Sequence, residues 1–218
     1  MTGIIKIMGD FDGGEFPDGW QRVCLKDICS INPKRSSGFS RSQNAPTTFV
    51  PMNAVDAVTG KIVGSQVQPF SQVESGYTFF LEGDVLFAKI TPCMQNGKHA
   101  IARNLIDGIG FGSTEFHIIR TNSEVLPEWI HGYLRQRAVL IEAMNYFTGA
   151  VGQQRVPDRF LRELEIPLPP LHEQKRIAAI LRERMTAVER ARKAAEEQLE
   201  NINALPGALL RQAFRGEL

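Results

Sequence analysis

Residues 166–205 read IPLPPLHEQKRIAAILRERMTAVERARKAAEEQLENINAL, which is a proline-rich segment followed by a long stretch without glycine or proline. Proline donates no backbone hydrogen bond and clashes with the preceding helical turn, so a helix cannot begin before Pro170. Good helix formers dominate from Leu171 onward. The pattern predicts a helix from Leu171 to about Leu205, roughly 50 Å long at 1.5 Å per residue.

This helix carries a heptad seam, because small and apolar residues recur at alternating steps of three and four. The seam positions are Ala178, Leu181, Met185, Val188, Arg192, Ala195, Leu199 and Ile202. An exposed apolar seam is usually buried against another helix, so we expect a partner helix to pack on it. The expected interface residues are Leu181, Met185, Val188, Ala195, Leu199 and Ile202. A helix folded back on its own domain is the alternative.

A second copy of the chain fits the seam. Small residues within 188–195 allow two helices to approach closely around a two-fold axis. We expect antiparallel arms in a homodimer, because parallel arms would crowd both N-terminal domains at one end. The segment after Pro206, with Leu209, Leu210 and Phe214, is expected to form a short terminal helix near the partner's proline segment.

Composition sets broad limits on the chain. With 218 residues and 43% hydrophobic content, it can form one core plus an extended element. The sequence has no apolar run long enough for a membrane span and no signal-peptide pattern, so we expect a soluble, cytoplasmic protein. Cys24, Cys29 and Cys93 form no CxxC pair, and the histidines are scattered. Neither a zinc site nor a disulfide framework is expected, and the thiols should be reduced.

The remaining sequence predicts one α+β domain before the helical arm. Short apolar runs separated by turn residues indicate strands, and a helix is expected after Pro127. The expected strands are residues 22–27, 48–52, 61–67, 77–81, 84–90, 99–104, 111–120 and 164–168, with the helix at 128–147. They should form a twisted, mostly antiparallel β-sheet, with residues 79–81 and 85–87 in its core. The expected domains are a flexible leader at residues 1–19, the α+β domain at 20–168 and the arm at 169–218.

Three loops concentrate positive charge, although the net charge of the chain is only +1. Lysine and arginine suit phosphate contacts, while amide side chains and arginine suit base edges. The basic candidates in the first two loops are Lys34, Arg35 and Arg41, and then Lys89, Lys98 and Arg103. The second loop also carries Gln95 and Asn96, and the third carries Gln153, Gln154 and Arg155. An ordinary solvated loop is the alternative for each.

Catalytic patterns are missing from the sequence. Residues 108–113 are glycine-rich, but they lack the Gly-Lys-Ser/Thr ending of a phosphate loop and precede a strand, so we expect a turn. Asp158, Glu163 and Glu165 would suit a metal nuclease, but no lysine follows at the expected offset. We expect no catalytic residues, no metal site and no enzyme activity in the isolated chain.

Several segments resemble the DNA specificity subunits of type I restriction-modification systems. The segment IPLPPLHEQKRIAAIL at 166–181 and the ending LLRQAFRGEL at 209–218 are similar to their conserved helical region. GDVLFAKITPCMQNGK at 83–98, FTGAVGQQRVP at 147–157 and FPDGWQRVCLKDI at 16–28 resemble stretches of their target recognition domains. Those subunits normally carry two recognition domains and two helical regions, and this chain has one of each, so it resembles a half-size form.

The resemblance implies a DNA-reading role without catalysis. The recognition domain would read one half of a bipartite double-stranded DNA target, and the arm would hold a second domain at a fixed distance. Methylation subunits would dock on the chain and bring S-adenosylmethionine, and a restriction subunit would bring ATP and Mg²⁺. The six lysines and arginines of the first two loops would grip phosphates. Gln95, Asn96, Gln153, Gln154 and Arg155 would be the candidates for base edges. The alternative is a coiled-coil adaptor that does not read bases.

Overall fold

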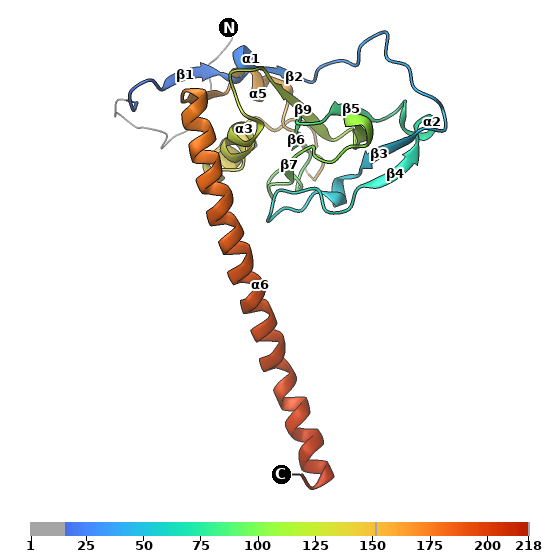
Figure 1. The fold of residues 1–218 in the computed structure, drawn as a ribbon, viewed down its shortest axis with the longest axis vertical. Coiled ribbons are helices and arrows are strands. Elements are labelled where there is room, and N and C mark those ends of the chain that lie inside the picture. The colour runs from blue at the N-terminus through green and yellow to red at the C-terminus, as the bar shows by residue number, and fades with distance from the viewer. Residues whose placement is uncertain (1–15, 151, 218) are drawn as a thin grey trace. The chain divides into compact units, whose positions relative to one another are not determined.

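The computed structural model describes residues 16–150 and 152–217, and the chain divides into two compact units, Met1–Lys175 and Arg176–Leu218. The first unit contains all the strands (Figure 1). The second unit consists of most of one long helix. Most of the expected flexible leader, up to residue 15, lies outside the described residues. The expected domain boundaries stay a prediction.

The central layer of the first unit is a four-stranded antiparallel sheet in the order β2-β9-β6-β7. Its strands are β2 (Cys29–Ile31), β9 (Phe116–Thr121), β6 (Val85–Ala88) and β7 (His99–Ile101). Successive side chains of a strand point to opposite faces, and both faces of β6 are buried. Val85 and Phe87 belong to one core cluster, whereas Leu86 and Ala88 belong to another. This strand therefore joins the two halves of the core.

A second four-stranded sheet, in the order β4-β3-β8-β5, forms the next layer. Its strands are β4 (Gln66–Pro69), β3 (Pro46–Val50), β8 (Ile109–Gly112) and β5 (Thr78–Leu81), and only β3 and β8 pair in parallel. Val50 and Phe80 from this sheet pack in the same cluster as Leu86. A Cβ on Gly110 would lie 2.3 Å from the Phe80 ring. Of the glycines expected to form a turn, Gly108 ends η2, whereas Gly110 and Gly112 are part of β8, where their small size admits Phe80.

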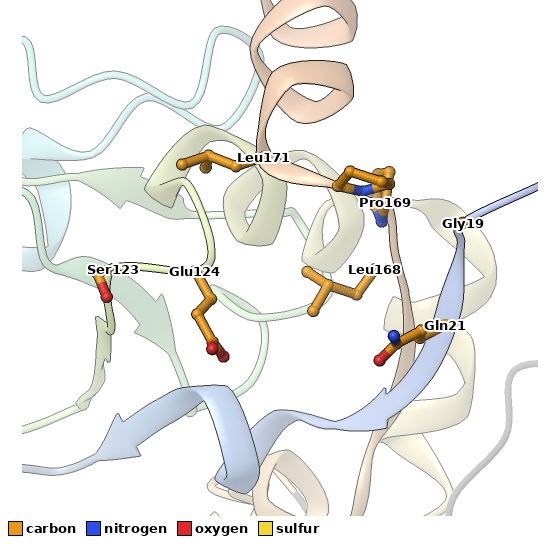
Figure 2. Close-up of a pocket in the computed structure, with 8 residues that line it drawn as sticks. Gly19, Gln21, Ser123, Glu124, Leu168, Pro169 and Leu171 are labelled. Carbon is orange, nitrogen blue, oxygen red and sulfur yellow. The ribbon is translucent and has the colours of Figure 1, made fainter.

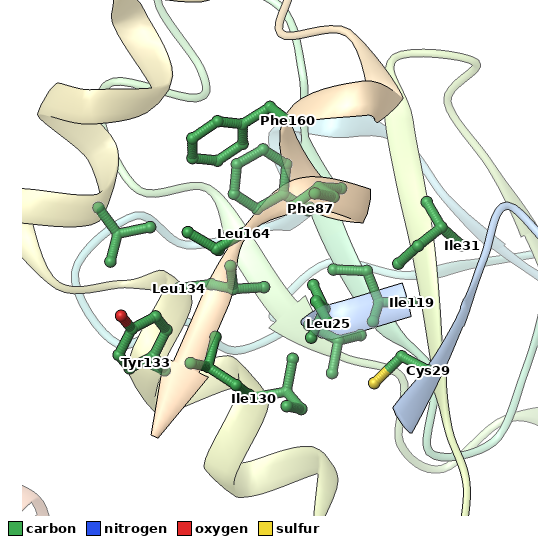
Figure 3. Packing of buried hydrophobic residues seen from close by; sticks show 14 of the residues in the cluster. Leu25, Cys29, Ile31, Phe87, Ile119, Ile130, Tyr133, Leu134, Phe160 and Leu164 are labelled. Atoms are coloured by element: carbon green, nitrogen blue, oxygen red, sulfur yellow. The ribbon is translucent and has the colours of Figure 1, made fainter. Parts of the chain in front are cut away.

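Helices cover the other face of the central sheet (Figure 3). The four helices are α1 (Leu25–Ile28), α3 (Pro127–Leu134), α4 (Arg137–Met144) and α5 (Asp158–Glu163). Leu25, Ile130, Leu134 and Phe160 from three of them pack around Phe87 of the sheet. A short helix, α2 (Phe70–Val73), packs instead in a phenylalanine cluster with Phe49 and Phe111 of the second sheet. Two 3₁₀ turns, η1 (Met52–Ala54) and η2 (Ile106–Gly108), complete the unit.

The predicted single helix at residues 128–147 is wrong, because α3 and α4 are separated at Arg135 and Gln136. Gln136 has extended backbone angles. The Arg135 guanidinium donates hydrogen bonds to the carbonyls of Gly97 and Val58 at 2.7 and 2.8 Å. These hydrogen bonds tie Arg135 to two other loops at the point where α3 ends. Burial of this guanidinium lowers the pKa of Arg135.

A two-stranded antiparallel ribbon closes the first unit and leads into the long helix. β1 (Gln21–Cys24) pairs with β10 (Glu165–Leu168), and α6 (Leu171–Arg215) begins where the proline segment ends, as predicted. The backbone N–H groups of Glu173 and Gln174 donate to the carbonyl of Pro170, which opens the helix. The observed strands and long helix confirm the α+β class, although the strands form three sheets instead of one.

The expected short terminal helix after Pro206 is wrong, because α6 continues through this proline to Arg215. Proline inside a helix removes one hydrogen bond and costs about 3 kcal/mol. Ala204 and Leu205 before the proline and Ala208 to Leu210 after it are helix formers, although Gly207 directly follows the proline. At 1.5 Å per residue, the 45 residues of α6 span about 68 Å.

Candidate nucleic-acid interface

Three of the predicted phosphate-binding residues gather around one hollow. Lys34 and Arg35 come from the loop after β2, and Lys89 comes from the end of β6. The hollow has a volume of about 310 Å³. Its lining residues are Asn32, Pro33, Lys34, Arg35, Thr78, Phe79, Lys89, Thr114, Phe116, His117 and Ile118. We call this the basic hollow, and it brings together two loops that the sequence analysis treated separately.

A hydrogen-bonded network forms one wall of the basic hollow. His117 is buried, and its Nε2–H donates to the carbonyl of Val156 at 2.8 Å. Its Nδ1 therefore accepts, and the donor is the Asn32 Nδ2–H at 3.0 Å. The Asn32 side-chain oxygen in turn accepts the Ile118 N–H. Burial lowers the pKa of His117, so the imidazole stays neutral and the positive charge of the hollow belongs to its lysines and arginine.

Asn32 adopts a left-handed backbone conformation, with φ of 51°. Asparagine tolerates this region better than most residues because its side chain bonds locally. Here the turn directs the chain from β2 toward Lys34 and Arg35, while the Asn32 side chain holds His117. Arg35 also lies over the Phe39 ring, with its guanidinium carbon 5.5 Å from the centroid. Sequence reasoning missed Asn32 and His117, whose role depends on contact between residues far apart in the chain.

Three loops converge beside the basic hollow, and we call them the three-loop edge. The first loop is residues 89–91 and the second is residues 113–115. The third loop contributes residues 148–150 and 152–156. Backbone hydrogen bonds join them. The backbone N–H of Lys89 donates to the carbonyl of Glu115 at 2.9 Å, and the backbone N–H of Val156 donates to the carbonyl of Lys89 at 2.9 Å. Thr91 donates to the carbonyl of Gln154 at 2.9 Å, and Arg155 bridges to both Ile90 and Thr148. Lys89 therefore belongs to both the hollow and the edge.

The three-loop edge also contains a forked ion pair. Arg155 Nε donates to Glu115 Oε2 at 2.9 Å, and Nη2 donates to Oε1 at 2.8 Å. The hydrogen bond from Arg155 is the main reason that the pKa of Glu115 is lowered. The remaining terminal nitrogen of Arg155 donates to the carbonyl of Gln153 at 3.0 Å. Gln153 is exposed and Gln154 half-buried, so the edge presents amides beside this arginine.

The other predicted phosphate-binding residues lie outside the basic hollow and already have protein partners. Arg41 Nη2 donates to Asp107 at 2.7 Å, and Arg103 Nη2 donates to Glu128 at 2.7 Å. Lys98 contacts the carbonyl of Met52 at 3.4 Å. The loops carry no acids in the sequence, but the fold supplies acids from other segments. DNA contact by these three residues stays a prediction.

The first two amide candidates occupy the turn between β6 and β7. Gln95 Nε2 lies 3.9 Å from the sulfur of Met144, which is a weak contact, and Asn96 is exposed. Neither side chain lines the basic hollow. Base reading by Gln95, Asn96, Gln153, Gln154 and Arg155 stays a prediction.

A second pocket lies at the start of α6 (Figure 2). Its volume is about 460 Å³. The lining residues are Gly19, Gln21, Ser123, Glu124, Leu168, Pro169, Pro170 and Leu171. Gln174, fully buried beside it, donates to the carbonyls of Glu124 and Pro169 and accepts the Leu126 N–H. The proline segment was recognised in the sequence, but this pocket was not.

The acids considered for a metal nuclease are held by arginines. Asp158 pairs with Arg162 at 3.0 Å, and Glu163 pairs with Arg159 at 2.9 Å. Glu165 lies 3.8 Å from Arg22. Among the described residues, no group of three or more histidine, cysteine or acidic side chains could hold a metal ion. The same residues include no helix that is long and apolar enough to cross a bilayer.

The predicted seam residues of α6 are exposed in a single chain. The exposed fractions of Leu181, Met185, Val188, Leu199 and Ile202 lie between 49% and 60%. The apolar surface extends beyond the predicted seam to Leu205, Leu209, Leu210 and Phe214. Arg192, on a seam position, donates to Glu196 at 2.8 Å along the same helix. Exposed apolar surface of this extent on one helix favours a partner.

Comparison with known proteins finds one matching family model and several similar chains. The family model described as type I restriction modification DNA specificity domain matches residues 17–201. The chain is 34% identical over 175 residues to the type I restriction enzyme EcoEI specificity subunit of Escherichia coli, covering 80% of this chain and 29% of that one. It is 37% identical over 167 residues to the EcoAI specificity subunit of Escherichia coli, covering 75% and 27%.

A solved structure shares the fold. It comes from work on complex assembly and conformational transition of the type I R-M system, and its similarity has a TM-score of 0.75 at 26% identity. The match covers 91% of this chain and 50% of the solved chain. This chain therefore spans half of the solved chain and less than a third of the two specificity subunits.

Proposed function

This chain belongs to the family of type I restriction modification DNA specificity domains, and from that premise we propose that it is a DNA-recognition subunit of a type I restriction-modification complex. Its recognition domain reads one half of a bipartite target. The observation that carries this proposal is the adjacency of the basic hollow and the three-loop edge, which share Lys89. The hollow offers charge for phosphates, and the edge offers amide and guanidinium groups for bases.

The chain supplies specificity and leaves chemistry to other subunits. The acids that would suit a nuclease are paired with arginines, which supports a non-catalytic role. A type I methylation subunit docks on the chain and brings S-adenosylmethionine. A restriction subunit brings ATP and Mg²⁺. Robust methyl transfer or DNA cleavage by the purified chain alone would contradict this division of labour.

Two copies of the chain pair through antiparallel α6 helices. The exposed apolar residues of α6 support this arrangement, because a second copy offers the same surface. Each recognition domain joins its arm at Leu171, so antiparallel arms attach the two domains at opposite ends. Two identical readers related by a two-fold axis prefer inverted half-sites. The length of the arm exceeds one turn of DNA, about 34 Å, so unread base pairs lie between the half-sites.

The test is DNA binding by the purified chain, alone and with its methylation subunit. We expect affinity to fall steeply with salt, because lysines and arginines displace counterions from phosphates. Changing Lys89 to alanine should weaken binding to all sequences alike and flatten the salt dependence by about one unit for each phosphate that is no longer bound. In a selection from a random duplex DNA pool, the Lys89→Ala variant should enrich the same two-part sequence as the wild type.

An adaptor that does not read bases is the second candidate, favoured only by the exposed surface of α6. It would bind a partner helix while enriching no sequence from the pool. Enrichment of a defined two-part sequence excludes the adaptor. If neither the isolated chain nor its complex with the methylation subunit enriches any sequence, DNA reading by this chain is excluded.

A further inference from the structure

Arg155 is fixed before any DNA arrives. Its backbone N–H and carbonyl pair with Thr148 at 2.9 and 3.0 Å, and it bridges on its other side to Ile90. Glu115 then holds the guanidinium through two hydrogen bonds, of 2.9 and 2.8 Å. Both the backbone and the tip of this long side chain are therefore held in place. An arginine normally loses much rotamer freedom when it binds, and this one has already lost it.

The ion pair leaves Arg155 able to donate outward. A guanidinium has five N–H donors. Glu115 takes one on Nε and one on Nη2, and the carbonyl of Gln153 takes one on Nη1. Of five donors, three are used among the described residues, which leaves one on each terminal nitrogen. The Arg155 side chain is 40% exposed, so these donors can reach a ligand.

One free N–H on each terminal nitrogen gives the number of donors that one base edge accepts, with a fork when the Gln153 carbonyl takes the Nη1 hydrogen nearer Cδ. Guanine presents O6 and N7 as adjacent acceptors in the major groove, and arginine binds them as a fork. Adenine presents an acceptor beside a donor, so it repels one arm of this fork. A phosphate can also accept a forked pair of hydrogen bonds from arginine, and base selection distinguishes the two contacts because a phosphate contact carries no base preference. The neighbouring Lys89 lines the basic hollow, where the proposed function places phosphate contacts.

We propose that Arg155, aimed by Glu115, reads a guanine in the half-site, and that Glu115 is the positioning residue for this choice. The inference rests on the proposed function. Glu115 does not compete with DNA for Arg155. It occupies the side of the guanidinium that DNA does not use and prevents the arginine from swinging toward phosphates. Glu115 comes from the turn before β9, 40 residues from Arg155 in the sequence, and sequence reasoning did not identify it.

The experiment compares selection from a random duplex DNA pool by four forms of the full chain with its methylation subunit. The forms are wild type, Glu115→Gln, Arg155→Lys and Glu128→Gln. Wild type should enrich a half-site with one guanine preferred roughly 5- to 150-fold, the range for a good bidentate pair. Glu115→Gln should lower that preference at least about fivefold while total DNA affinity changes less than about twofold. Arg155→Lys keeps the charge but loses the fork, so it should flatten the same position.

Glu128→Gln is the matched control, because it changes an arginine–glutamate pair away from the three-loop edge, and its partner Arg103 is a predicted phosphate-binding residue, so any effect falls on affinity for all sequences alike. It should leave the base preferences unchanged. The inference is overturned if Glu115→Gln keeps the wild-type profile, or if it weakens every position equally while lowering the melting temperature, which is the signature of a structural role. It is also overturned if Glu115→Gln and Arg155→Lys flatten different positions. Failure of wild type to enrich any sequence instead overturns the proposed function.

Discussion

The ion pairs of the first unit differ mainly in how deeply their carboxylates are buried. The Asp84 side chain is 2% exposed and Glu115 is 24% exposed, although both receive a forked pair of hydrogen bonds from an arginine. A buried carboxylate without its partner is costly, whereas an exposed one is solvated. Asp84 with Arg120 is therefore structural, whereas Glu115 with Arg155 is accessible to solvent.

Changing Arg120 to methionine should lower the free energy of unfolding by about 3 to 5 kcal/mol, because it leaves Asp84 charged and unpaired in the core. Lys193→Met provides the control, since Lys193 pairs with Glu197 on the exposed surface of α6, off the seam, and should change stability by less than about 1 kcal/mol. Urea unfolding measures both. Equal effects of the two substitutions would contradict the difference in burial.

His131 should make the protein sensitive to acid. Its Nε2–H donates to the carbonyl of His99 at 2.9 Å, and burial lowers its pKa to about 4. The unfolded chain protonates this histidine near pH 6.5, so between about pH 6.5 and 4 the unfolded state binds more protons than the folded state. The free energy of unfolding therefore falls as pH falls through this window, by roughly 2 to 3 kcal/mol from this residue.

The measurement is urea unfolding of wild type and His131→Gln at pH 7 and pH 4.5. Glutamine keeps an N–H donor but does not titrate. We expect a smaller loss of stability in the variant between the two pH values. The same loss in both proteins would show that His131 does not cause the acid sensitivity.

Among the elements, β6 shows how far the sequence could predict the core. The apolar run from Val85 to Phe87 predicted a strand in the central core, and Val85 to Ala88 are buried and divide between two clusters. The interruption at Arg135 could not be predicted, because its cause is a set of carbonyls that the fold brings from residues 57–58 and 97–99. Pro206 predicted a helix end, and Gly207 beside it is also a poor helix former, yet α6 continues through both to Arg215.

The start of α6 depends on one buried amide. Changing Gln174 to alanine should lower the free energy of unfolding by about 2 to 4 kcal/mol, since it leaves the Glu124 and Pro169 carbonyls and the Leu126 N–H without their partner. Gln198→Ala, on the exposed surface of the same helix, should change it by less than about 0.5 kcal/mol. Urea unfolding compares the two. Similar effects would rule out a special role for Gln174.

At the scale of the whole molecule, the sequence could predict the class of fold and the family but only part of the interface. Heptad spacing and the proline segment are patterns of residues close together in the sequence, so they could be recognised without the fold. The predicted start of α6 at Leu171 is accordingly confirmed. The basic hollow depends on contacts between distant segments, such as Asn32 with His117. The sequence could identify Lys34, Arg35 and Lys89 as basic residues, but it could not show which of the basic loops meet.

The proposed homodimer predicts a specific loss of assembly. Changing Leu181, Val188 and Leu199 together to glutamate should yield monomers at micromolar concentration, because a charged seam cannot be buried against its copy. Analytical ultracentrifugation measures the mass. The control substitutes glutamate at Thr186, Ala194 and Asn201, which lie off the seam and add the same charge. A monomeric wild-type protein, or a monomeric control, would contradict pairing through this surface.

The most direct test of the DNA-reading role is a map of methylated sites in cells that carry this chain as the sole specificity subunit, together with its methylation subunit. The account predicts methylation at one sequence whose two halves are inverted copies separated by unread base pairs. Charged substitutions on the seam should abolish that pattern. Methylation of an asymmetric site, or a pattern that is the same when the chain is absent, would contradict it.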